Sequence, residues 1–386
     1  MDPYLRDVLD VCLRLLHVTA GIAWIGASFY FVRLDLSLRP PKRPENAPGV
    51  AGEFWGVHGG GLYHSQKYRL APAEMPEPLH WFKWEAYTTW LSGFALLVVL
   101  YYFDADTRLV DATVAGLEEW EAIALSVGGL ALAWVVYDVL CRTIGRRSQL
   151  WLAGIGVVLL ALAAWAAGEL FAARAAFLQV GAMVGTIMAA NVLLVIIPAH
   201  RKLVAAMAAG RLASAEPLLE AKRRSVHNNY LTLPVLFTML VGHFAFVFGH
   251  EDAWLALVLI SVLLVAVRHF FNLWHTGYRA WWILGAAAAG TVALAFWLEP
   301  EEAPPSTAEP VSFAQIQPIV EERCAACHAG AAAPLGVRLE TQTEIEARAG
   351  DIERQAVLTR TMPPGNSTGM TEEERELLAA WIASTR

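Results

Sequence analysis

The pentapeptide Cys324-Ala325-Ala326-Cys327-His328 divides the chain into two unequal parts and indicates what the shorter part is. Its form, C-x-x-C-H, is the attachment site of a c-type haem: two thiols form thioethers with the porphyrin, and the adjacent histidine ligates the iron. A C-x-x-C redox pair or half of a zinc site would use the same cysteines, but no second cysteine pair accompanies them. The motif therefore predicts one covalent haem held by Cys324, Cys327 and His328, and an electron-carrying domain.

A second iron ligand is expected downstream, on a rigid loop that reaches the opposite haem face. Met362, in Thr361-Met362-Pro363-Pro364-Gly365, fits this role because its prolines restrict the backbone beside a soft sulfur donor. Met370 is the competing candidate, but it immediately precedes a helix start. His/Met ligation raises the reduction potential, which suits acceptance of electrons from a substrate oxidation. The predicted iron ligands are therefore His328 and Met362.

Composition places the longer part of the chain in a lipid bilayer. Hydrophobic residues make up 56% of the 386 and charged residues only 17%, well to the apolar side of an ordinary globular chain. The net charge of −7 argues against nucleic acid as a partner. Cys12 and Cys141 lie in or beside apolar segments without partners and are expected to be buried, inert thiols.

Apolar runs long enough to cross a hydrocarbon core about 30 Å thick recur along residues 1–298. The first run lacks a basic leader and is too long for a cleavable signal peptide, so we expect an uncleaved insertion signal. The predicted fold class is all-α, an eight-helix transmembrane bundle followed by a small, class I-like cytochrome c domain. The predicted spans are 9–32, 85–103, 121–141, 150–167, 175–198, 230–249, 253–271 and 280–298.

Charge asymmetry between the spans predicts the orientation of the bundle. The segments on one side carry 18 Lys and Arg against 7 Asp and Glu, and those on the other side carry 3 against 11. The first set is 33–84, 142–149, 199–229 and 268–280; the second is 1–8, 104–121, 168–174 and 249–253. The positive-inside rule puts the first set in the cytoplasm and both termini in the periplasm. Covalent haem attachment and persistent thiol chemistry belong on that same side.

The residues after the eighth span divide into a tether and a small domain. Residues 299–311 are rich in Pro and acid and are predicted to be a flexible linker. In the domain 312–386 we expect a helix over Phe313–Cys327, an irregular haem-enclosing stretch, and a closing helix that starts at a capping box of Thr371 and Glu374. A domain of about 75 residues needs the haem to complete its apolar core.

Ionisable residues within spanning helices are expensive and are functional candidates. His17 and His243 are each predicted to lie roughly 10 Å below the periplasmic surface, at 1.5 Å per residue. They are candidate ligands of one non-covalent b haem; the alternative is that they form interhelical hydrogen bonds. His269, near the cytoplasmic end of the seventh span, is the candidate for a second haem.

Hydrogen-bonding side chains concentrate at the cytoplasmic membrane edge, mixed with Trp and Tyr, which suggests a pocket for a flat polar molecule. An interfacial aromatic belt and a tight glycine turn explain some of these residues individually. The candidate substrate and catalytic residues are His58, His64, Lys67, Lys83, Glu85, His227, Asn228 and Asn229.

Six motifs occur in order along the chain: HVTAGIAWIG at 17–26, VHGGG at 57–61, LHWFKWEAY at 79–87, SVHNNYLTLP at 225–234, RHFFN at 268–272 and CAACH at 324–328. In this order they resemble the membrane-integral urate oxidase (urate hydroxylase) family, which joins a urate oxidase N-terminal domain to a cytochrome c tail. The resemblance covers nearly the whole length. The tail motif is common to many cytochromes, whereas the membrane motifs are specific.

The resemblance implies oxidation of urate to 5-hydroxyisourate in purine degradation, in a bacterial inner (plasma) membrane. Electrons would leave through haem c to a soluble cytochrome or a terminal oxidase, without direct peroxide formation. Urate would bind in the cytoplasm-facing pocket, where Lys67 or Lys83 offsets its charge and a histidine or Glu85 accepts a proton. Its edge would be read by His227, Asn228 and Asn229. Because the electrons must cross most of the bilayer, a haem b in the membrane part is expected besides haem c.

Two other functions use the same features. A dehydrogenase for quinol or another small molecule would send electrons along the same route. A transporter or porphyrin-related membrane protein would use the cytochrome as a redox sensor, and the first helix is also similar to helices of protoporphyrinogen-oxidising membrane proteins. Against a plain transporter, the sequence shows no inverted repeat and no evident pair of broken helices.

Overall fold

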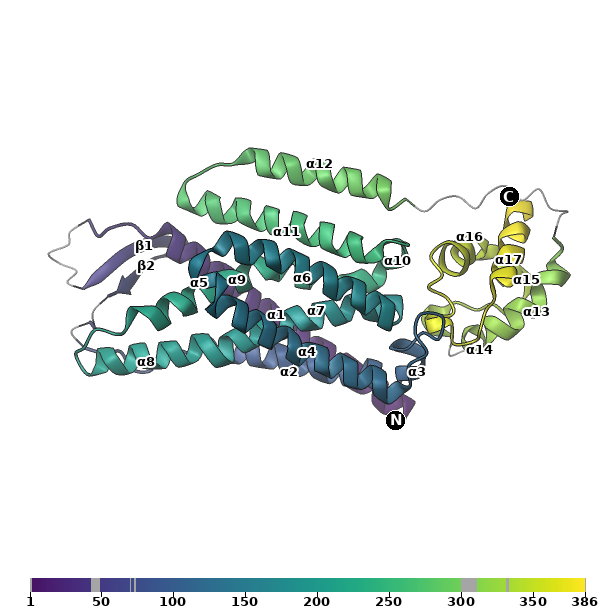
Figure 1. Ribbon diagram of the computed structural model, residues 1–386, viewed down its shortest axis with the longest axis horizontal. Coiled ribbons are helices and arrows are strands. Elements are labelled where there is room, and N and C mark those ends of the chain that lie inside the picture. Colours follow the sequence, from purple (N-terminus) through teal and green to yellow (C-terminus); the bar gives the residue numbers. More distant parts are fainter. Residues whose placement is uncertain are drawn as a thin grey trace.

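The main body of the protein is a bundle of long helices that carries a β-hairpin at one end and a small helical domain at the other (Figure 1). A computed structural model gives this arrangement. The residues it describes are 2–42, 49–69, 71–72, 74–299, 311–330 and 333–385. The prediction of a helical fold is confirmed in part, since most of the described residues are helical.

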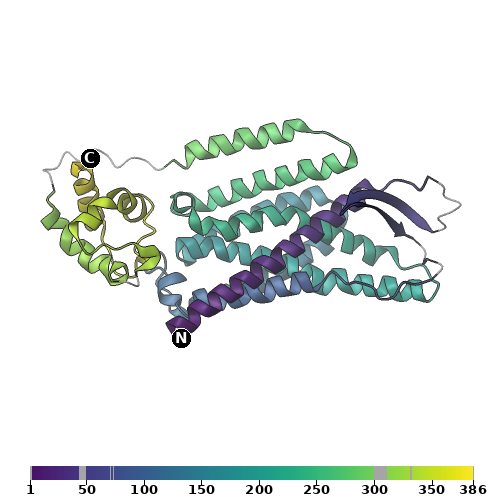
Figure 2. The ribbon, with the colours of Figure 1, turned by 180° about the vertical axis from the view of Figure 1, so that it is seen from behind.

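The bundle helices run alternately toward the hairpin end and toward the tail end (Figures 1 and 2). Each predicted span coincides largely with one of them or its continuation, except the sixth. The helices are α1 (Pro3–Ser37), α2 (Trp84–Leu97) with a π-helical extension Val98–Tyr102, α4 (Glu119–Arg142), α6 (Gln149–Leu170), α7 (Ala173–Ala190) with a π-helical extension Asn191–Ile196 and then α8 (Ile197–Ala208), α9 (Ala215–Leu240), α11 (Ala253–Thr276) and α12 (Trp281–Trp297). Short helices join them: α3 (Ala105–Arg108), α5 (Ile144–Arg147) and α10 (Ala245–Phe248).

Several of these helices are able to cross a membrane. Among the described residues, five helical stretches are long and apolar enough, namely Tyr4–Ser37, Glu119–Arg147, Gln149–Leu170, Ala173–Ala208 and Ala253–Thr276. The helix Trp281–Trp297 is apolar but shorter. Their outward faces carry exposed Leu, Val and Trp side chains, as expected for surfaces in contact with lipid.

The sixth span differs from its prediction. It was expected over 230–249, but α9 starts at Ala215 and ends at Leu240, and His243 lies in the following 3-10 turn Val241–His243. Hydropathy finds the apolar run and misses the polar first half of the helix. That half is nevertheless helical because Ala221, Arg224 and Asn228 are buried against neighbouring helices.

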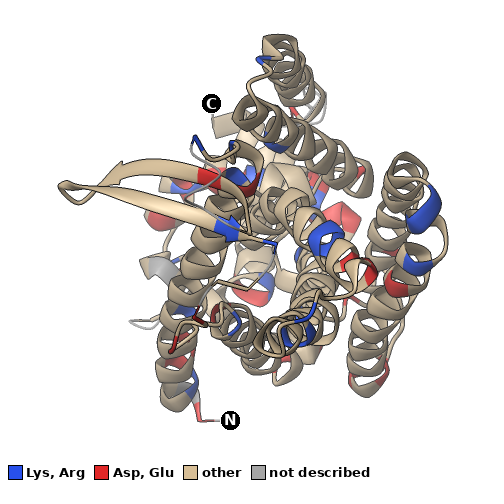
Figure 3. Ribbon diagram, turned by 90° about the vertical axis from the view of Figure 1, so that its left-hand side faces the viewer, with Lys and Arg blue, Asp and Glu red and all other residues tan. Residues whose placement is uncertain are grey.

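A two-stranded antiparallel hairpin interrupts the otherwise helical fold, which corrects the all-α prediction. Strands β1 (Val50–His58) and β2 (Gly61–Tyr68) pair His58 with Gly61. Gly59 and Gly60 form the turn with φ of +55° and +81°, values that favour glycine. The hairpin projects from the bundle at an end where Figure 3 shows Lys and Arg, as well as Asp and Glu, on several segments.

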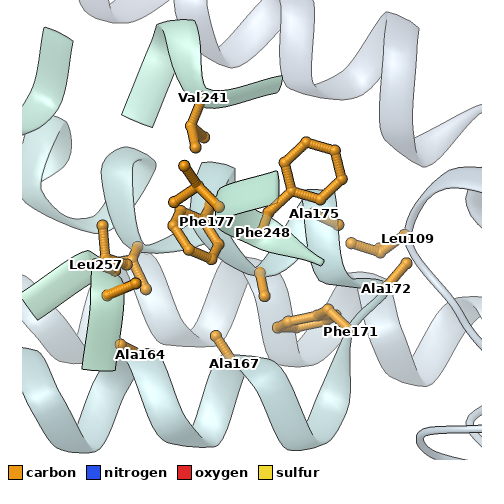
Figure 4. Packing of buried hydrophobic residues seen from close by; sticks show 14 of the residues in the cluster. Leu109, Ala164, Ala167, Phe171, Ala172, Ala175, Phe177, Val241, Phe248 and Leu257 are labelled. Atoms are coloured by element: carbon orange, nitrogen blue, oxygen red, sulfur yellow. The ribbon is translucent and has the colours of Figure 1, made fainter. Parts of the chain in front are cut away.

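The largest apolar core lies toward the tail end of the bundle. Buried Phe171, Phe177, Val241, Phe248 and Leu257 interdigitate with alanines of α6 and α7 (Figure 4). Alanine at these positions lets helix backbones approach closely, as small residues do in membrane helix bundles. The tail domain contacts the bundle at this same end.

In the tail domain the first and last helices pack against each other. Helices α13 (Phe313–Arg323) and α17 (Glu372–Thr385) pack through Ile316, Val320, Leu378 and Ile382. Between them lie α14 (Ala325–His328), α15 (Gln342–Ala347), α16 (Ala349–Ile352) and the π-helical turn Glu353–Leu358. The expected first helix is thus two, broken at Cys324. The predicted linker 299–311 lies, apart from its ends, outside the described residues.

The tail domain contacts the bundle through its Met362 loop. At Gly365, whose φ is +57°, an added Cβ would lie 2.7 Å from the carbonyl oxygen of Val110, just after α3. At Gly249, at the end of α10, an added Cβ would lie 2.5 Å from the carbonyl oxygen of Thr359. Two glycines, one on each side, therefore permit the close approach of the two domains.

Candidate functional site

The C-x-x-C-H segment presents its histidine as an iron ligand would be presented. His328 Nδ1 lies 2.9 Å from the carbonyl oxygen of Val337 and donates its proton there, which leaves the Nε2 lone pair for a metal. Cys324 and Cys327 are free thiols on the same turn. Burial raises the pKa of the Cys324 thiol to about 11. These residues fit a covalent haem.

The loop that carries Met362 is held by a buried arginine. Arg375 of α17 donates to the carbonyl oxygens of Met362, at 3.1 Å, and Ala356. The Met362 side chain is 37% exposed, whereas Met370 is 4% exposed in the apolar core. Of the two candidates, Met362 has the sulfur that is free of core packing and able to reach a ligand.

The capping box predicted at the start of α17 is present and is tied to the first tail helix. The Thr371 N–H donates to Glu374 and the Glu374 N–H donates to Thr371 Oγ1. Arg323 makes a bidentate ion pair with the same carboxylate at 3.0–3.1 Å. Burial opposes ionisation of Glu374, but the hydrogen bonds from Arg323 and Thr371 outweigh it and hold the pKa of Glu374 below its usual 4.5.

No group of three or more His, Cys, Asp and Glu side chains able to hold a bare metal ion occurs among the described residues. Haem needs only one or two protein ligands, so His328 and Met362 remain the candidates for iron.

Three predicted substrate residues lie on the hairpin and are exposed. His58 is at the turn. His64 stacks on Trp55 and lies 2.9 Å from Glu53. Lys67 pairs with Asp35, which also pairs with Lys222 at 2.6 Å. His64 and Lys67 are thus engaged with neighbouring side chains, and all three residues are exposed to solvent on the hairpin.

Lys83 and Glu85 stand at the start of α2, at the hairpin end of the bundle. The Lys83 ammonium lies 5.3 Å from the centre of the Trp84 ring. Glu85 Oε1 lies 3.7 Å from His80 Nε2, and its Oε2 is buried without a hydrogen-bond partner. Glu85 therefore has an oxygen free to accept a proton.

The consecutive residues His227, Asn228 and Asn229 point to different neighbours, because successive helical residues are turned by about 100°. His227 Nδ1 lies 2.8 Å from Tyr137 Oη, and Asn228 bonds Asn191 at 2.9 Å. Asn229 faces α11 instead. The structure therefore divides the single predicted pocket into two polar clusters.

The first cluster is centred on Arg224, whose charge and hydrogen bonds are satisfied by other members of the cluster. Arg224 is fully buried and reaches Glu220 and Asp138, each at 2.8 Å. Its third contact is Asn191 Oδ1, at 3.1 Å, at the start of the π-helical segment Asn191–Ile196. Two carboxylates surround one guanidinium, so this cluster carries its own counter-charge and needs no ligand.

The second cluster is centred on Asn229, Arg268 and Asn272, between α9 and α11. Arg268 Nε and Asn272 Nδ2 both donate to Asn229 Oδ1 at 2.9 Å. The Arg268 guanidinium lies 3.7 Å from the centre of the Phe29 ring of α1. All three polar residues are less than 8% exposed, yet Asn229 Nδ2, Arg268 Nη2 and Asn272 Oδ1 have no hydrogen-bond partner.

The candidate membrane-haem histidines lie in separate surroundings. His17 Nδ1 lies 2.9 Å from the carbonyl oxygen of Thr89 on α2, against Gly93, which leaves Nε2 available. His243 is exposed in the turn after α9. His269 is exposed and bonds the Tyr230 hydroxyl at 2.7 Å. The His17 ring is therefore oriented with one nitrogen available to a ligand-binding partner such as a metal.

Comparison with known proteins identifies the bundle. A family model described as "Urate oxidase N-terminal" matches residues 3–299. The chain belongs to the urate oxidase N-terminal family. The match covers α1 to α12, including both polar clusters, and stops before the tail domain. No curated protein and no solved structure matches the chain. Membership of the urate oxidase N-terminal family supports a urate-related oxidoreductase activity.

Sequence reasoning missed Arg268 and Asn272 as site residues, although both lie in the RHFFN motif. A signal was present: Arg224 has Glu220 one helical turn before it, whereas α11 contains no acidic residue to pair with Arg268. A buried arginine without a carboxylate on its own helix is expensive unless something else supplies the negative charge.

Proposed function

We propose that the protein oxidises urate within the bundle and passes the electrons to a haem c in the tail domain. The balanced step is urate plus water to 5-hydroxyisourate, two electrons and two protons. The observation that carries the proposal is the fusion, in one chain, of a urate oxidase N-terminal domain to a segment in which His328 Nε2 is left free for iron.

The tail contributes the electron exit. When bound, haem c supplies one-electron redox chemistry. Cys324 and Cys327 would hold it covalently, and His328 and Met362 would ligate the iron. Val337 fixes the His328 tautomer and Arg375 fixes the Met362 loop. That loop docks beside α3 and Gly249, so a haem in the tail domain would lie on the domain that contacts the bundle.

The bundle contributes the substrate end. Glu85, whose Oε2 has no partner, is the proton acceptor proposed for urate as it loses electrons, and water then adds at C5. Lys67 is unsuited to its predicted role of offsetting the charge of urate, because it already pairs with Asp35.

Electrons would need an intermediate carrier between the substrate end of the bundle, taken at the level of Arg268, and the tail domain. Arg268 lies 15 residues from the tail end of α11, or roughly 22 Å at 1.5 Å per residue. His17 lies between these levels on α1, 12 residues from Phe29 and 14 from the tail end of the helix. We therefore keep His17 as the proposed ligand of a non-covalent haem b in the bundle. In this account the basic hairpin end faces the cytoplasm and the tail faces the periplasm of a bacterial inner membrane.

The test is anaerobic turnover of purified full-length protein with excess oxidised soluble cytochrome c as acceptor, in water enriched in oxygen-18. The expected result is two cytochromes reduced per urate consumed, with one heavy oxygen in 5-hydroxyisourate. Strict dependence on oxygen with stoichiometric peroxide would overturn the proposal. So would reduction of the tail by quinol with none by urate, which is the outcome expected of a quinol dehydrogenase.

A further inference from the structure

We propose that Arg268, Asn229 and Asn272 form the anion-binding site for urate, in the interior of the bundle between α9 and α11. The inference rests on the proposed function and deepens it by naming the residues that hold the substrate. It replaces the exposed hairpin residues His58, His64 and Lys67 as the expected contacts.

The buried charge of Arg268 is not balanced by a carboxylate in the described part of the chain. Arg268 is 5% exposed and permanently charged, yet it forms no ion pair with a carboxylate of the described residues. Arg224, buried in the neighbouring cluster, has two such partners. The Phe29 ring face attracts the guanidinium but carries no net charge. Of the two arginines buried within the bundle, Arg268 is therefore the one that lacks a negative partner, and a bound anion would supply it.

Three buried polar atoms of the cluster have no hydrogen-bond partner among the described residues. Asn229 Oδ1 receives two donors, so its amide orientation is fixed and its Nδ2 faces away from them. Asn272 gives its Nδ2 to Asn229, which fixes its Oδ1 as a free acceptor. Together with Arg268 Nη2, the cluster offers two donors and one acceptor without partners. Such groups are rarely left unpaired in a folded protein.

The free acceptor distinguishes between possible anions. A phosphate group could accept from Arg268 and Asn229, but an ionised phosphate ester has no hydrogen to give to Asn272 Oδ1, and inorganic hydrogen phosphate has only one, on a tetrahedral rather than a planar group. Urate is a planar monoanion whose edges carry both carbonyl oxygens and ring N–H groups, so it can meet all three atoms. The dry surroundings strengthen each of these bonds. The Phe29 ring of α1 covers the Arg268 guanidinium on one side of the cluster.

The test measures urate binding without turnover. Full-length protein is first reduced with ascorbate under anaerobic conditions, and binding of labelled urate is followed by equilibrium dialysis. Arg268→Gln is expected to weaken binding at least about tenfold, the loss of one hydrogen bond from a charged donor. Arg279→Gln, which removes an exposed arginine from the loop after α11, is the matched control and should bind as the unsubstituted protein does. Arg268→Lys, which keeps the charge, serves if the glutamine variant fails to fold and should also bind more weakly.

The possible results separate this inference from the proposed function. If the unsubstituted protein binds urate and both Arg268 variants bind it equally well, the site assignment is wrong while the proposed function stands. If the unsubstituted protein binds no urate, both are wrong. Competition extends the test: displacement of urate by xanthine but not by inorganic phosphate is expected, and the reverse would assign the cluster to a phosphate group.

Discussion

Replacement of Gly249 by valine tests whether the tail domain must sit on the bundle to receive electrons. A Cβ at this position would lie 2.5 Å from the carbonyl oxygen of Thr359 and 2.6 Å from Thr359 Cβ, where ordinary contacts begin at 3.4 Å. Both opposing atoms are backbone or attached directly to it, so neither can rotate away. The tail must therefore lift from its seat by roughly 1 Å or tilt. Overpacking of this kind costs about 1–3 kcal/mol, which corresponds to a change of about 5- to 150-fold in the docking equilibrium.

The assay has two readouts on the same sample. Hydrogen exchange should show faster exchange in 104–111 and 359–366, the segments on the two sides of the contact. Stopped-flow mixing with urate should show slower reduction of haem c by a factor in the same range, whereas reduction by ascorbate should be unchanged. Gly116→Val is the matched control, because an added Cβ there would meet nothing within 4 Å. Unchanged exchange and unchanged reduction by urate in the Gly249 variant would refute the docking argument.

Three further predictions address the rest of the molecule. Arg224→Met should lower the free energy of unfolding, by up to about 3–5 kcal/mol, because it removes the buried partner of Asp138 and Glu220, two half-buried carboxylates that keep only the exposed Arg142 and Arg223; thermal unfolding in detergent measures it, and a near-neutral result would contradict a structural role. Glu374→Gln keeps the capping box but removes the charge. Since the pKa of Glu374 is lowered in the folded protein, the carboxylate stabilises the tail above about pH 4.5 and loses this effect as the pH falls through its folded pKa. The variant should thus be less stable than the unsubstituted protein at neutral pH and approach it in acid; equal melting temperatures at neutral pH would count against it. Met362→Ala should remove the sulfur-to-iron charge-transfer band and lower the reduction potential, whereas Met370→Ala should chiefly destabilise the core; the opposite pattern would make Met370 the ligand.

Much of the architecture is visible in the sequence because hydropathy and capping are local signals. Long apolar runs predict the bundle helices, and Thr371 with Glu374 predicts the start of α17. The hairpin 50–68 was missed because its alternation is weak and it lies in a loop defined only by its charges. The early start of α9 was missed because its polar residues are buried by packing, which hydropathy does not detect.

The candidate site depends on which helix each side chain faces, and sequence alone does not give this. His227, Asn228 and Asn229 are adjacent in the chain and were grouped for that reason, yet they belong to two clusters. Arg268 becomes notable only when its missing counter-charge is compared with the complete one around Arg224. By contrast, the proposed haem attachment residues are adjacent in sequence, so a motif is sufficient to propose them.

The central claim is that electrons from urate reach the tail domain through the bundle. Its most direct test is an anaerobic optical difference spectrum of purified full-length protein before and after addition of urate, with the haem type established by pyridine haemochrome analysis. The account predicts reduction of the c-type band, and a separate b-type signal that is lost in His17→Ala. A tail that stays oxidised with excess urate, but is reduced by ascorbate, would contradict it.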